Sequence, residues 1–445
     1  MAKHMSSSPK VVADTIHDII DISEVLPMIE TREFQALSDK RQLGMTPLIF
    51  RSARHSRFEH SIGAYQGTKL LTDRWLRNGM VSKKERDALV AYALYHDIGH
   101  PPFSHVTEEL CEMDNNEMTL FLIRERLMGA IEACGFDPVL VEKLAAHENP
   151  LYLGVHDKNL GMEKFDYLER DGRSTLLSGP VGLEYLREHI YFIDGTIAVD
   201  EKAIDHTIDV LSFYMKMYKN VYLRKASVIA QRMFEKAVYL LMQRKELGVK
   251  ELPDMTDSEL LGRMVLSKDP IVQFLYTCYR ERHLFREAIV IRPKEFASET
   301  NAEKKDIRVF EVTHDEMQAL TTSPALKKAN YSALEKLEQT IAAIAKIPEE
   351  EVLVVPIFHP ERFKAKDVAI YGSDGKLHSL RQRRPAHFDS MEETARSYAA
   401  VRVCAHPQYR KKLSAPAVAE RVFEVLLSAS KPEKETRRAT KTTKT

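Results

Sequence analysis

Apolar residues return every three or four positions through most of the first two thirds of the chain, from about residue 16 to residue 290. Short breaks at Gly and Pro separate these runs, and no long alternating run interrupts them. This spacing predicts a succession of α-helices. The clearest example is "DALVAYALYHD" (87–97), and its predicted buried face consists of Ala88, Ala91, Tyr92 and Tyr95.

The pattern changes after residue 290. Amphipathic stretches at 332–347 and 415–427 predict two helices. We predict a helical domain over 1–290, an α+β domain over 291–430 and a disordered basic tail over 431–445, in a fold that is mainly α. The β-rich segments that predict strands are 306–314, 351–359, 367–380 and 398–406.

Composition and charge narrow the functional classes. The 445 residues include 65 basic and 65 acidic side chains, so the formal net charge of zero indicates neither a nucleic-acid nor a membrane partner. No run of about 18 apolar residues predicts a membrane span, and the first residues contain no apolar leader segment. The four cysteines are far apart and show no CxxC spacing. We therefore expect reduced thiols and a cytoplasmic protein.

Candidate chemistry concentrates in "ALYHDIGHPPFSHVTEEL" (93–110), which contains three histidines and an aspartate within ten residues. His96 and Asp97 end the apolar helical run, where ionisable groups are costly unless they are paired or bound to a metal. Gly99 and the two following prolines are expected to terminate the helix. A chance cluster of surface histidines is the alternative.

Two further segments carry polar groups at helical spacing. "RSARHSRFEHSIGAYQGTKLL" (51–71) is expected to place Arg57 and His60 just ahead of a helix. "MEKFDYLERDGRS" (162–174) is expected to form another helix. Its polar residues at i, i+4 and i+8 share nearly one face, which is either part of a site or a solvated surface. These three residues are Glu163, Tyr167 and Asp171.

Taken in order, "RFEHSIG", "HDIGHPPFSH" and "EKFDYLERD" resemble the anchoring motifs of the HD-domain phosphohydrolases. The resemblance is strongest to the dNTP triphosphohydrolase branch, without the sterile-alpha-motif domain of its animal member, and it covers most of the chain. It implies an all-helical HD domain followed by a smaller α+β C-terminal domain. It also implies a homo-oligomer, either a dimer or a tetramer, that binds a nucleotide substrate.

The resemblance implies one divalent metal ion. Its implied ligands are His60, His96, Asp97 and Glu163, the last standing where the family has aspartate. Two imidazoles and two carboxylates suit iron, manganese, magnesium or zinc. Asp166, three residues after Glu163, is either a substitute ligand or a charge near the start of a helix.

The resemblance also assigns roles around this metal. His105 corresponds to the group that protonates the leaving oxygen, with His100 beside it, and Asn116 stands where the family has an assisting histidine. Asparagine forms hydrogen bonds but does not carry protons at neutral pH. The implied substrate contacts are Arg57 and Lys164 for the phosphates, Tyr167, Asp171 and Tyr222 for the sugar, and Gln42 and Leu43 for the sugar and base.

The resemblance therefore predicts metal-dependent hydrolysis of deoxynucleoside triphosphates to deoxynucleoside and inorganic triphosphate. One alternative is an HD phosphohydrolase that acts on another nucleotide or on nucleic-acid ends. A second alternative is a nucleotide-binding regulatory protein with little catalysis. A basic cluster in "SLRQRRPAHF" (379–388) is expected to form either ordinary surface charge or a contact with a neighbouring subunit or a regulatory nucleotide, and it consists of Arg381, Arg383 and Arg384.

Overall fold

The computed structural model describes residues 8–300, 306–356 and 366–430, and these form two compact units. Of the described residues, the first unit contains 8–284 and 366–398. The second unit contains 285–300, 306–356 and 399–430. The predicted domain boundary at residue 290 falls inside strand β5 (Arg286–Pro293), and the predicted tail over 431–445 lies outside the described residues.

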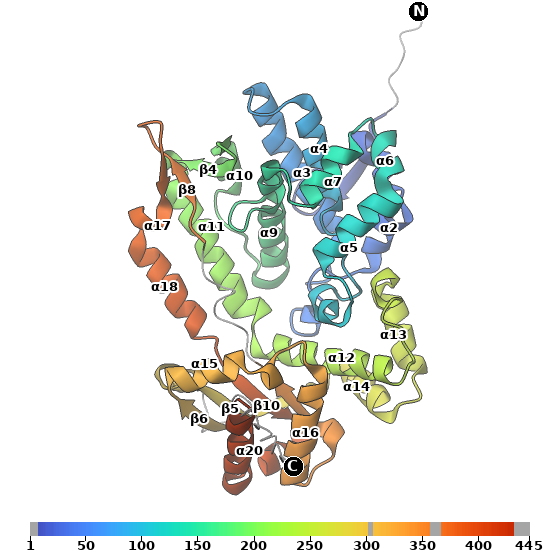
Figure 1. Cartoon of the computed structure of the whole chain (residues 1–445), viewed down its shortest axis with the longest axis vertical. Helices are drawn as coiled ribbons and strands as arrows, with labels where there is room; N and C mark the ends of the chain where they lie inside the picture. The colour runs from blue at the N-terminus through green and yellow to red at the C-terminus, as the bar shows by residue number, and fades with distance from the viewer. Residues whose placement is uncertain (1–7, 301–305, 357–365, 431–445) are drawn as a thin grey trace, which may run out of the picture. The chain divides into compact units, whose positions relative to one another are not determined.

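The first unit is mainly helical, as predicted (Figure 1). Its short connections contain several single turns of 3-10 helix. Its α-helices are α1 (Leu26–Ile29), α2 (Arg32–Ala36), α3 (Arg57–Arg77), α4 (Lys83–Tyr95), α5 (Asn115–Leu122), α6 (Met128–Ala133), α7 (Pro138–Ala145), α8 (Leu153–His156), α9 (Met162–Leu176), α10 (Leu183–Glu188), α11 (Ile204–Met217), α12 (Lys225–Gln243), α13 (Asp257–Leu266), α14 (Pro270–Glu281), α17 (Leu380–Arg383) and α18 (Pro385–Arg396).

The prediction of helices alone before residue 290 was wrong at three places. β1 (Val11–Asp14) pairs with β2 (Asp18–Asp21), and β3 (Ile190–Ile193) pairs with β4 (Thr196–Asp200). β4 also pairs with β8 (Ala369–Tyr371), which pairs with β9 (Leu377–Ser379). The third missed element is β5, which begins before residue 290.

Sequence carried a signal for the β3–β4 hairpin. Its two-residue turn is Asp194-Gly195, and both residues have positive φ angles, of 49° and 76°. Asp-Gly is a favoured pair for such a turn, because glycine adopts positive φ without strain and aspartate tolerates it. The flanking strands have only four and five residues, which is too short for a clear alternation of apolar and polar positions.

Reciprocal capping fixes where α3 begins. The Ser56 hydroxyl accepts a hydrogen bond from the Glu59 amide, and a Glu59 carboxylate oxygen accepts one from the Ser56 amide at 2.6 Å. This arrangement satisfies two amide groups that a helix start otherwise leaves unpaired. Arg57 and His60 therefore lie in the first turn of α3, on one face, and the prediction that they precede the helix was wrong.

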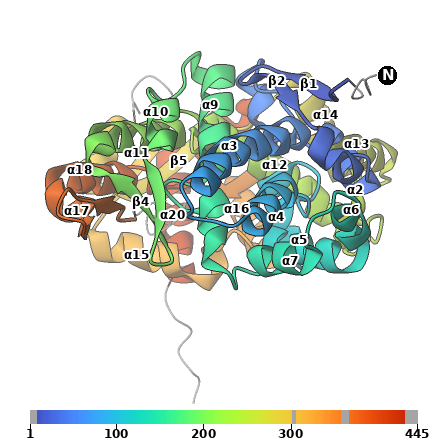
Figure 2. The same ribbon diagram turned by 90° about the horizontal axis from the view of Figure 1, so that it is seen from above.

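α4 has the predicted buried face. Every residue from Ala88 to Tyr95 is buried, and the helix ends at Tyr95 with His96 as its C-cap. The helix thus stops before Gly99 and the following prolines. α3 lies against both α4 and α9, as Figures 1 and 2 show. These contacts bring the three predicted motifs together.

The second unit is a small α+β unit, as predicted. Its sheet has the order β6-β5-β10-β7, in which β5 and β6 are parallel and β10 is antiparallel to both β5 and β7. An apolar core joins the sheet to its helices. The remaining elements are β6 (Arg308–Val312), β7 (Val352–Val355), β10 (Val401–Ala405), α15 (His314–Thr322), α16 (Tyr331–Ala345), α19 (Arg410–Leu413) and α20 (Pro416–Ala429).

Other expectations concern side chains outside the site. All four cysteines are free. Among the described residues, every helix is too short or too polar to cross a membrane. Each arginine of the basic cluster has an acidic partner within the first unit: Arg381 pairs with Glu392, Arg383 with Glu201 and Arg384 with Asp205.

Candidate metal centre and substrate site

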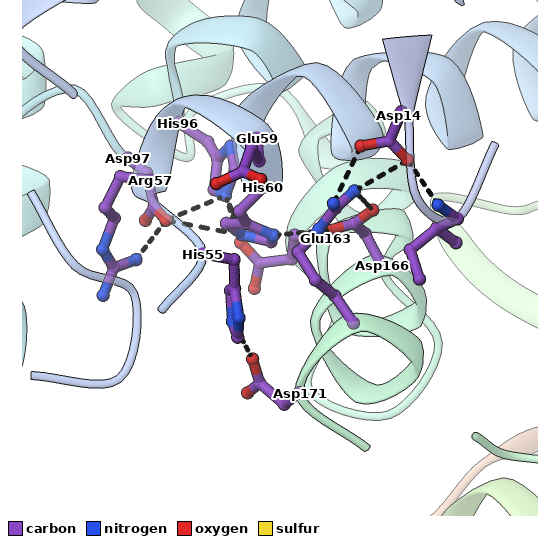
Figure 3. Close-up of polar contacts among 12 residues, drawn as sticks. Asp14, His55, Arg57, Glu59, His60, His96, Asp97, Glu163, Asp166 and Asp171 are labelled. Atoms are coloured by element: carbon purple, nitrogen blue, oxygen red, sulfur yellow. Dashed lines mark hydrogen bonds and ion pairs between the residues drawn. The ribbon is translucent and has the colours of Figure 1, made fainter. Parts of the chain in front are cut away.

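Four predicted metal ligands converge where α3, α4 and α9 meet (Figure 3). The Nε2 atoms of His60 and His96 lie 3.2 Å apart. The Asp97 Oδ2 atom lies 3.4 Å from the first of these nitrogens and 3.5 Å from the second. The Glu163 Oε2 atom lies 3.4 Å from His96 Nε2. Both histidines and the aspartate are almost fully buried, so the donor atoms face one another away from bulk water.

Hydrogen bonds on the far side of each imidazole indicate that this group fits a cation. His60 Nδ1 donates to Asp166 Oδ2 at 2.8 Å, and His96 Nδ1 donates to the Ala93 carbonyl at 2.7 Å. These bonds leave a lone pair on each Nε2 atom, which is the tautomer that metal ligation requires. Two lone pairs that face each other beside a carboxylate form a donor set for a divalent ion such as iron, manganese, magnesium or zinc.

Asp97 is held in its charged form. Burial would raise its pKa, but the adjacent Arg57 guanidinium, which hydrogen-bonds Asp97 Oδ2, keeps the pKa well below its usual range. Arg57 also donates from Nε to the Ser104 hydroxyl at 2.8 Å. His100 Nδ1 lies 3.2 Å from Asp97 Oδ1, and burial together with the charge of Arg57 lowers the His100 pKa to about 4. His100 is therefore neutral at physiological pH.

Glu163 has a partner that the sequence analysis missed. His156, at the end of α8, lies with Nδ1 2.8 Å from Glu163 Oε2, the oxygen that faces His96. The negative charge of Glu163 raises the pKa of His156 to about 9. The two residues are seven positions apart and separated by a break between helices, so no helical periodicity pointed to the pair.

Asp166 is neither a substitute metal ligand nor a charge at the start of a helix. Its Oδ2 atom binds the Nδ1 edge of His60, and the ring of His60 separates it from His96. Arg170 donates to both of its carboxylate oxygens at 2.8–3.0 Å and also to Asp14. Asp166 thus orients a ligand of the proposed metal site from behind.

Replacing Asp166 by asparagine is expected to lower Mn²⁺ affinity by about 10- to 100-fold, the usual loss when a carboxylate behind a metal-binding imidazole is removed. Titration calorimetry measures this change. Asp14→Asn is the matched control, because Asp14 also pairs with Arg170 but does not contact His60. Equal losses in the two variants would show that the Arg170 network supports the fold and has no separate effect on His60.

Two of the predicted sugar contacts, Tyr167 and Asp171, share the face of α9 that carries Glu163. Asp171 accepts hydrogen bonds from the Tyr222 hydroxyl and from His55 Nε2, each at 2.7 Å. The Tyr167 ring lies edge-on to His60, with 6.3 Å between ring centroids. The structure therefore brings Tyr167, Asp171 and Tyr222 to the same side as the ligand group and adds His55, which the sequence analysis did not select.

Gln42 and Leu43 precede α3. The backbone N–H of Gln42 donates to the His55 carbonyl at 3.2 Å. Gln42 and Leu43 therefore lie beside His55, which hydrogen-bonds Asp171. The side-chain oxygen of Gln42 is buried and has no hydrogen-bond partner among the described residues. Leu43 is half-buried. A buried acceptor of this kind is costly unless a ligand or water satisfies it.

Two predicted residues point elsewhere. The Lys164 amino group donates to the Lys158 carbonyl and lies 3.5 Å from the centroid of the Tyr214 ring, and burial lowers its pKa to about 7. Asn116 is exposed at the second position of α5. The buried neighbour is Asn115, whose amide donates to Glu108 Oε1 at 3.1 Å.

His105 lies at the edge of the site. Its side chain is 71% exposed, and its Nδ1 atom lies 2.6 Å from Glu108 Oε2. Its ring packs edge-on to His100, with centroids 4.9 Å apart. Glu108 therefore orients the His105 ring. Glu108 was not predicted from sequence, although it lies at i, i+3 from His105.

Comparison with known proteins gives the class. The HD domain family matches residues 57–151, and the HD associated region matches residues 181–317. The first match contains His60, His96 and Asp97, which the structure brings together. The chain belongs to the HD-domain phosphohydrolases, as its three motifs predicted.

Two relatives share about half of the chain. The chain is 28% identical over 293 residues to a deoxynucleoside triphosphate triphosphohydrolase SAMHD1 homolog from Dictyostelium discoideum, covering 59% of this chain and 56% of the relative. It is 30% identical over 251 residues to the uncharacterized protein YwfO from Bacillus subtilis, covering 53% and 57% respectively. The chain therefore spans little more than half the length of these relatives.

Solved structures share the fold. A phosphohydrolase from Bacteroides thetaiotaomicron aligns with a TM-score of 0.66 at 20% identity, covering 89% of this chain and 99% of that one. A hypothetical protein from Aquifex aeolicus gives the same score and identity, with coverages of 91% and 100%. The similarity therefore extends over both compact units.

Proposed function

We propose that this HD-domain protein hydrolyses deoxynucleoside triphosphates to deoxynucleoside and inorganic triphosphate with the help of a divalent metal ion. The observation that carries this proposal is the convergence of His60, His96, Asp97 and Glu163 beside Arg57. Asp171, about two helical turns after Glu163 on α9, accepts hydrogen bonds from Tyr222 and His55 and supports a sugar contact near this group. The similarity to a triphosphohydrolase homolog supports the same substrate class.

The metal ligands and Arg57 are proposed to act on the phosphates through their charges. A divalent ion held by the four ligands would polarise a phosphate and make water more acidic. Arg57 places a permanent positive charge beside these ligands, and its guanidinium geometry suits phosphate oxygens. The Nδ1 side of the neutral His100 ring faces Asp97, so its buried Nε2 atom, which has no partner among the described residues, can accept a hydrogen bond from water. The metal ion and Arg57 would stabilise the negative charge that accumulates when water attacks the α-phosphorus.

His105 is the proposed general acid. We expect its exposed ring, held by Glu108, to give a proton to the 5′ oxygen of the leaving deoxynucleoside. The P–O bond to that oxygen breaks as the water oxygen bonds to the α-phosphorus, and triphosphate leaves intact. Asn116 is exposed and has no part in this proposal.

Tyr222→Ala and Tyr167→Ala are expected to reduce the preference for deoxy- over ribonucleotides by about 10-fold or more, because aromatic groups that crowd C2′ discriminate by steric exclusion. Parallel kcat/KM measurements on dATP and ATP test this. Mn²⁺ affinity should stay near that of the parent protein. A matched fall in metal affinity and in hydrolysis of both nucleotides would mean that these tyrosines support the fold instead.

An unbiased nucleotide panel tests the proposed reaction. Each deoxy- and ribonucleoside triphosphate is incubated with the protein and Mn²⁺, and the products are separated by ion-exchange chromatography. Deoxynucleoside with inorganic triphosphate is the expected outcome. Monophosphate with pyrophosphate would instead support a phosphohydrolase of a different specificity, and no turnover would support a nucleotide-binding role.

A further inference from the structure

A pocket lies beside Asp166 in the first unit. It has a volume of about 440 Å³ and is lined by the β1–β2 turn, α3, α9 and α10. Figure 2 shows these four elements grouped around the same region. Gly63 and Gly67 leave room in the α3 wall, which Gln66 and Leu70 also line, and a Cβ atom at Gly63 would lie only 1.8 Å from Asp166 Oδ1. The pocket is therefore built on the side of Asp166 that faces away from the metal ligands.

Arg187 gives this pocket an unpaired positive charge. Its Nε atom is buried and has no hydrogen-bond partner, and within the described part of the chain its guanidinium forms no ion pair. Burial lowers the pKa of this arginine, and the nearby charges of Glu184 and Glu188 oppose that shift. A buried donor without a partner is costly, and a guanidinium suits the oxygens of carboxylates and phosphates.

The other charges near the pocket are largely paired. Arg173 and Glu169 form an ion pair at 2.6 Å. Asp166 is bonded by His60, His17 and Arg170. Asp18 at the start of β2 and Glu184 on α10 also line the pocket, and both are exposed to solvent. Arg187 is therefore the lining cation whose buried Nε atom has no hydrogen-bond partner among the described residues.

The remaining wall is apolar. Met162 and Phe165 on α9 are buried, and Leu183 and Pro180 also line the pocket. Burying an apolar body against such side chains is favourable by about 25 cal/mol per Å². We propose that this pocket binds a small organic anion, with an apolar body and one carboxylate or phosphate end that contacts Arg187.

The pocket is connected to the metal ligands by two contacts. His17, which lines the pocket, lies with Nε2 3.3 Å from Asp166 Oδ1, and Asp166 Oδ2 binds His60 Nδ1. A ligand that displaces the His17 ring therefore changes the support of His60. We infer that occupancy of the pocket alters metal affinity, and this part of the inference rests on the proposed metal site.

Calorimetric titration of the full-length protein with benzoate, phenyl phosphate and benzamidine tests the binding site. The first two probes carry a carboxylate and a phosphate on the same ring, and benzamidine carries a positive charge. We expect saturable binding of at least one anion, with at least about 10-fold weaker binding of benzamidine, which corresponds to one charge-assisted contact. The tighter anion identifies the preferred end group.

Arg187→Leu should weaken anion binding by about 10-fold or more, whereas Arg263→Leu should not change it. Arg263 is a suitable control because it lies on α13 with a side chain that is 48% exposed. Absence of anion binding at about 10 mM, equal binding of benzamidine, or unchanged binding by Arg187→Leu would overturn the site.

Mn²⁺ titrations with and without saturating anion test the connection. We expect at least about a threefold change in Mn²⁺ affinity in the parent protein and none in His17→Ala, a value within the usual range of coupling between sites. Anion binding without any change in Mn²⁺ affinity would overturn the connection. A protein that binds the anion through Arg187 but binds no metal would contradict the proposed function and leave the pocket assignment standing.

Discussion

His96→Ala is expected to lose its bound metal ion and its hydrolytic activity together. His96 Nε2 lies within 3.5 Å of donor atoms from all three other proposed ligands, so its removal opens the centre of the group. Substitutions behind a ligand already cost about 10- to 100-fold in metal affinity, so loss of the ligand itself should cost more than about 100-fold.

Metal analysis after gel filtration and initial rates of dNTP hydrolysis measure this result. His378→Ala is the control, because His378 lies in the β8–β9 hairpin and pairs with Asp374 at 2.9 Å. It should retain both metal and activity. A His96→Ala protein that stays folded, keeps its metal and turns over substrate would refute the proposed metal centre.

Glu163→Asp, which restores the acid usual in the family, is expected to lower both Mn²⁺ affinity and activity by about 10-fold. The shorter side chain withdraws its oxygens by about 1.5 Å. Glu163 Oε2 now reaches both His96 and His156, at 3.4 and 2.8 Å, so the surrounding residues have packed around the longer acid.

Manganese affinity and kcat, measured on the same preparations, check this prediction. Glu142→Asp on α7 is the control, since Glu142 pairs with Arg124 and not with a proposed ligand. Higher activity in Glu163→Asp would mean that glutamate is a defect at this position. Unchanged metal affinity and rate would show that Glu163 is not a ligand.

The helices that carry the site could be predicted because their patterns are long. The apolar run before His96 and the i, i+4, i+8 spacing after Glu163 each extend over more than two turns, and α4 and α9 follow them. The start of α3 was misplaced by a few residues, although Ser56 and Glu59 form a recognisable capping box. Short strands such as β3 lack enough residues for a period to emerge.

Directions of side chains could not be predicted in the same way. Lys164 follows Glu163 in sequence, yet its amino group is buried against Tyr214, a residue fifty positions away. The first turn of α5, capped by Asp114, buries Asn115 and exposes Asn116. His156, His55 and Glu108 lie in loops and short helices. Such segments have no regular period, so the directions of their side chains could not be predicted from spacing.

The most direct test of the account is the fate of oxygen during hydrolysis in water enriched in the heavy oxygen isotope. Mass spectrometry of the products from dATP and Mn²⁺ should show one heavy oxygen in inorganic triphosphate and none in deoxyadenosine, because water attacks the α-phosphorus and the 5′ oxygen leaves. Heavy oxygen in deoxyadenosine, or release of pyrophosphate with a labelled monophosphate, would contradict the account.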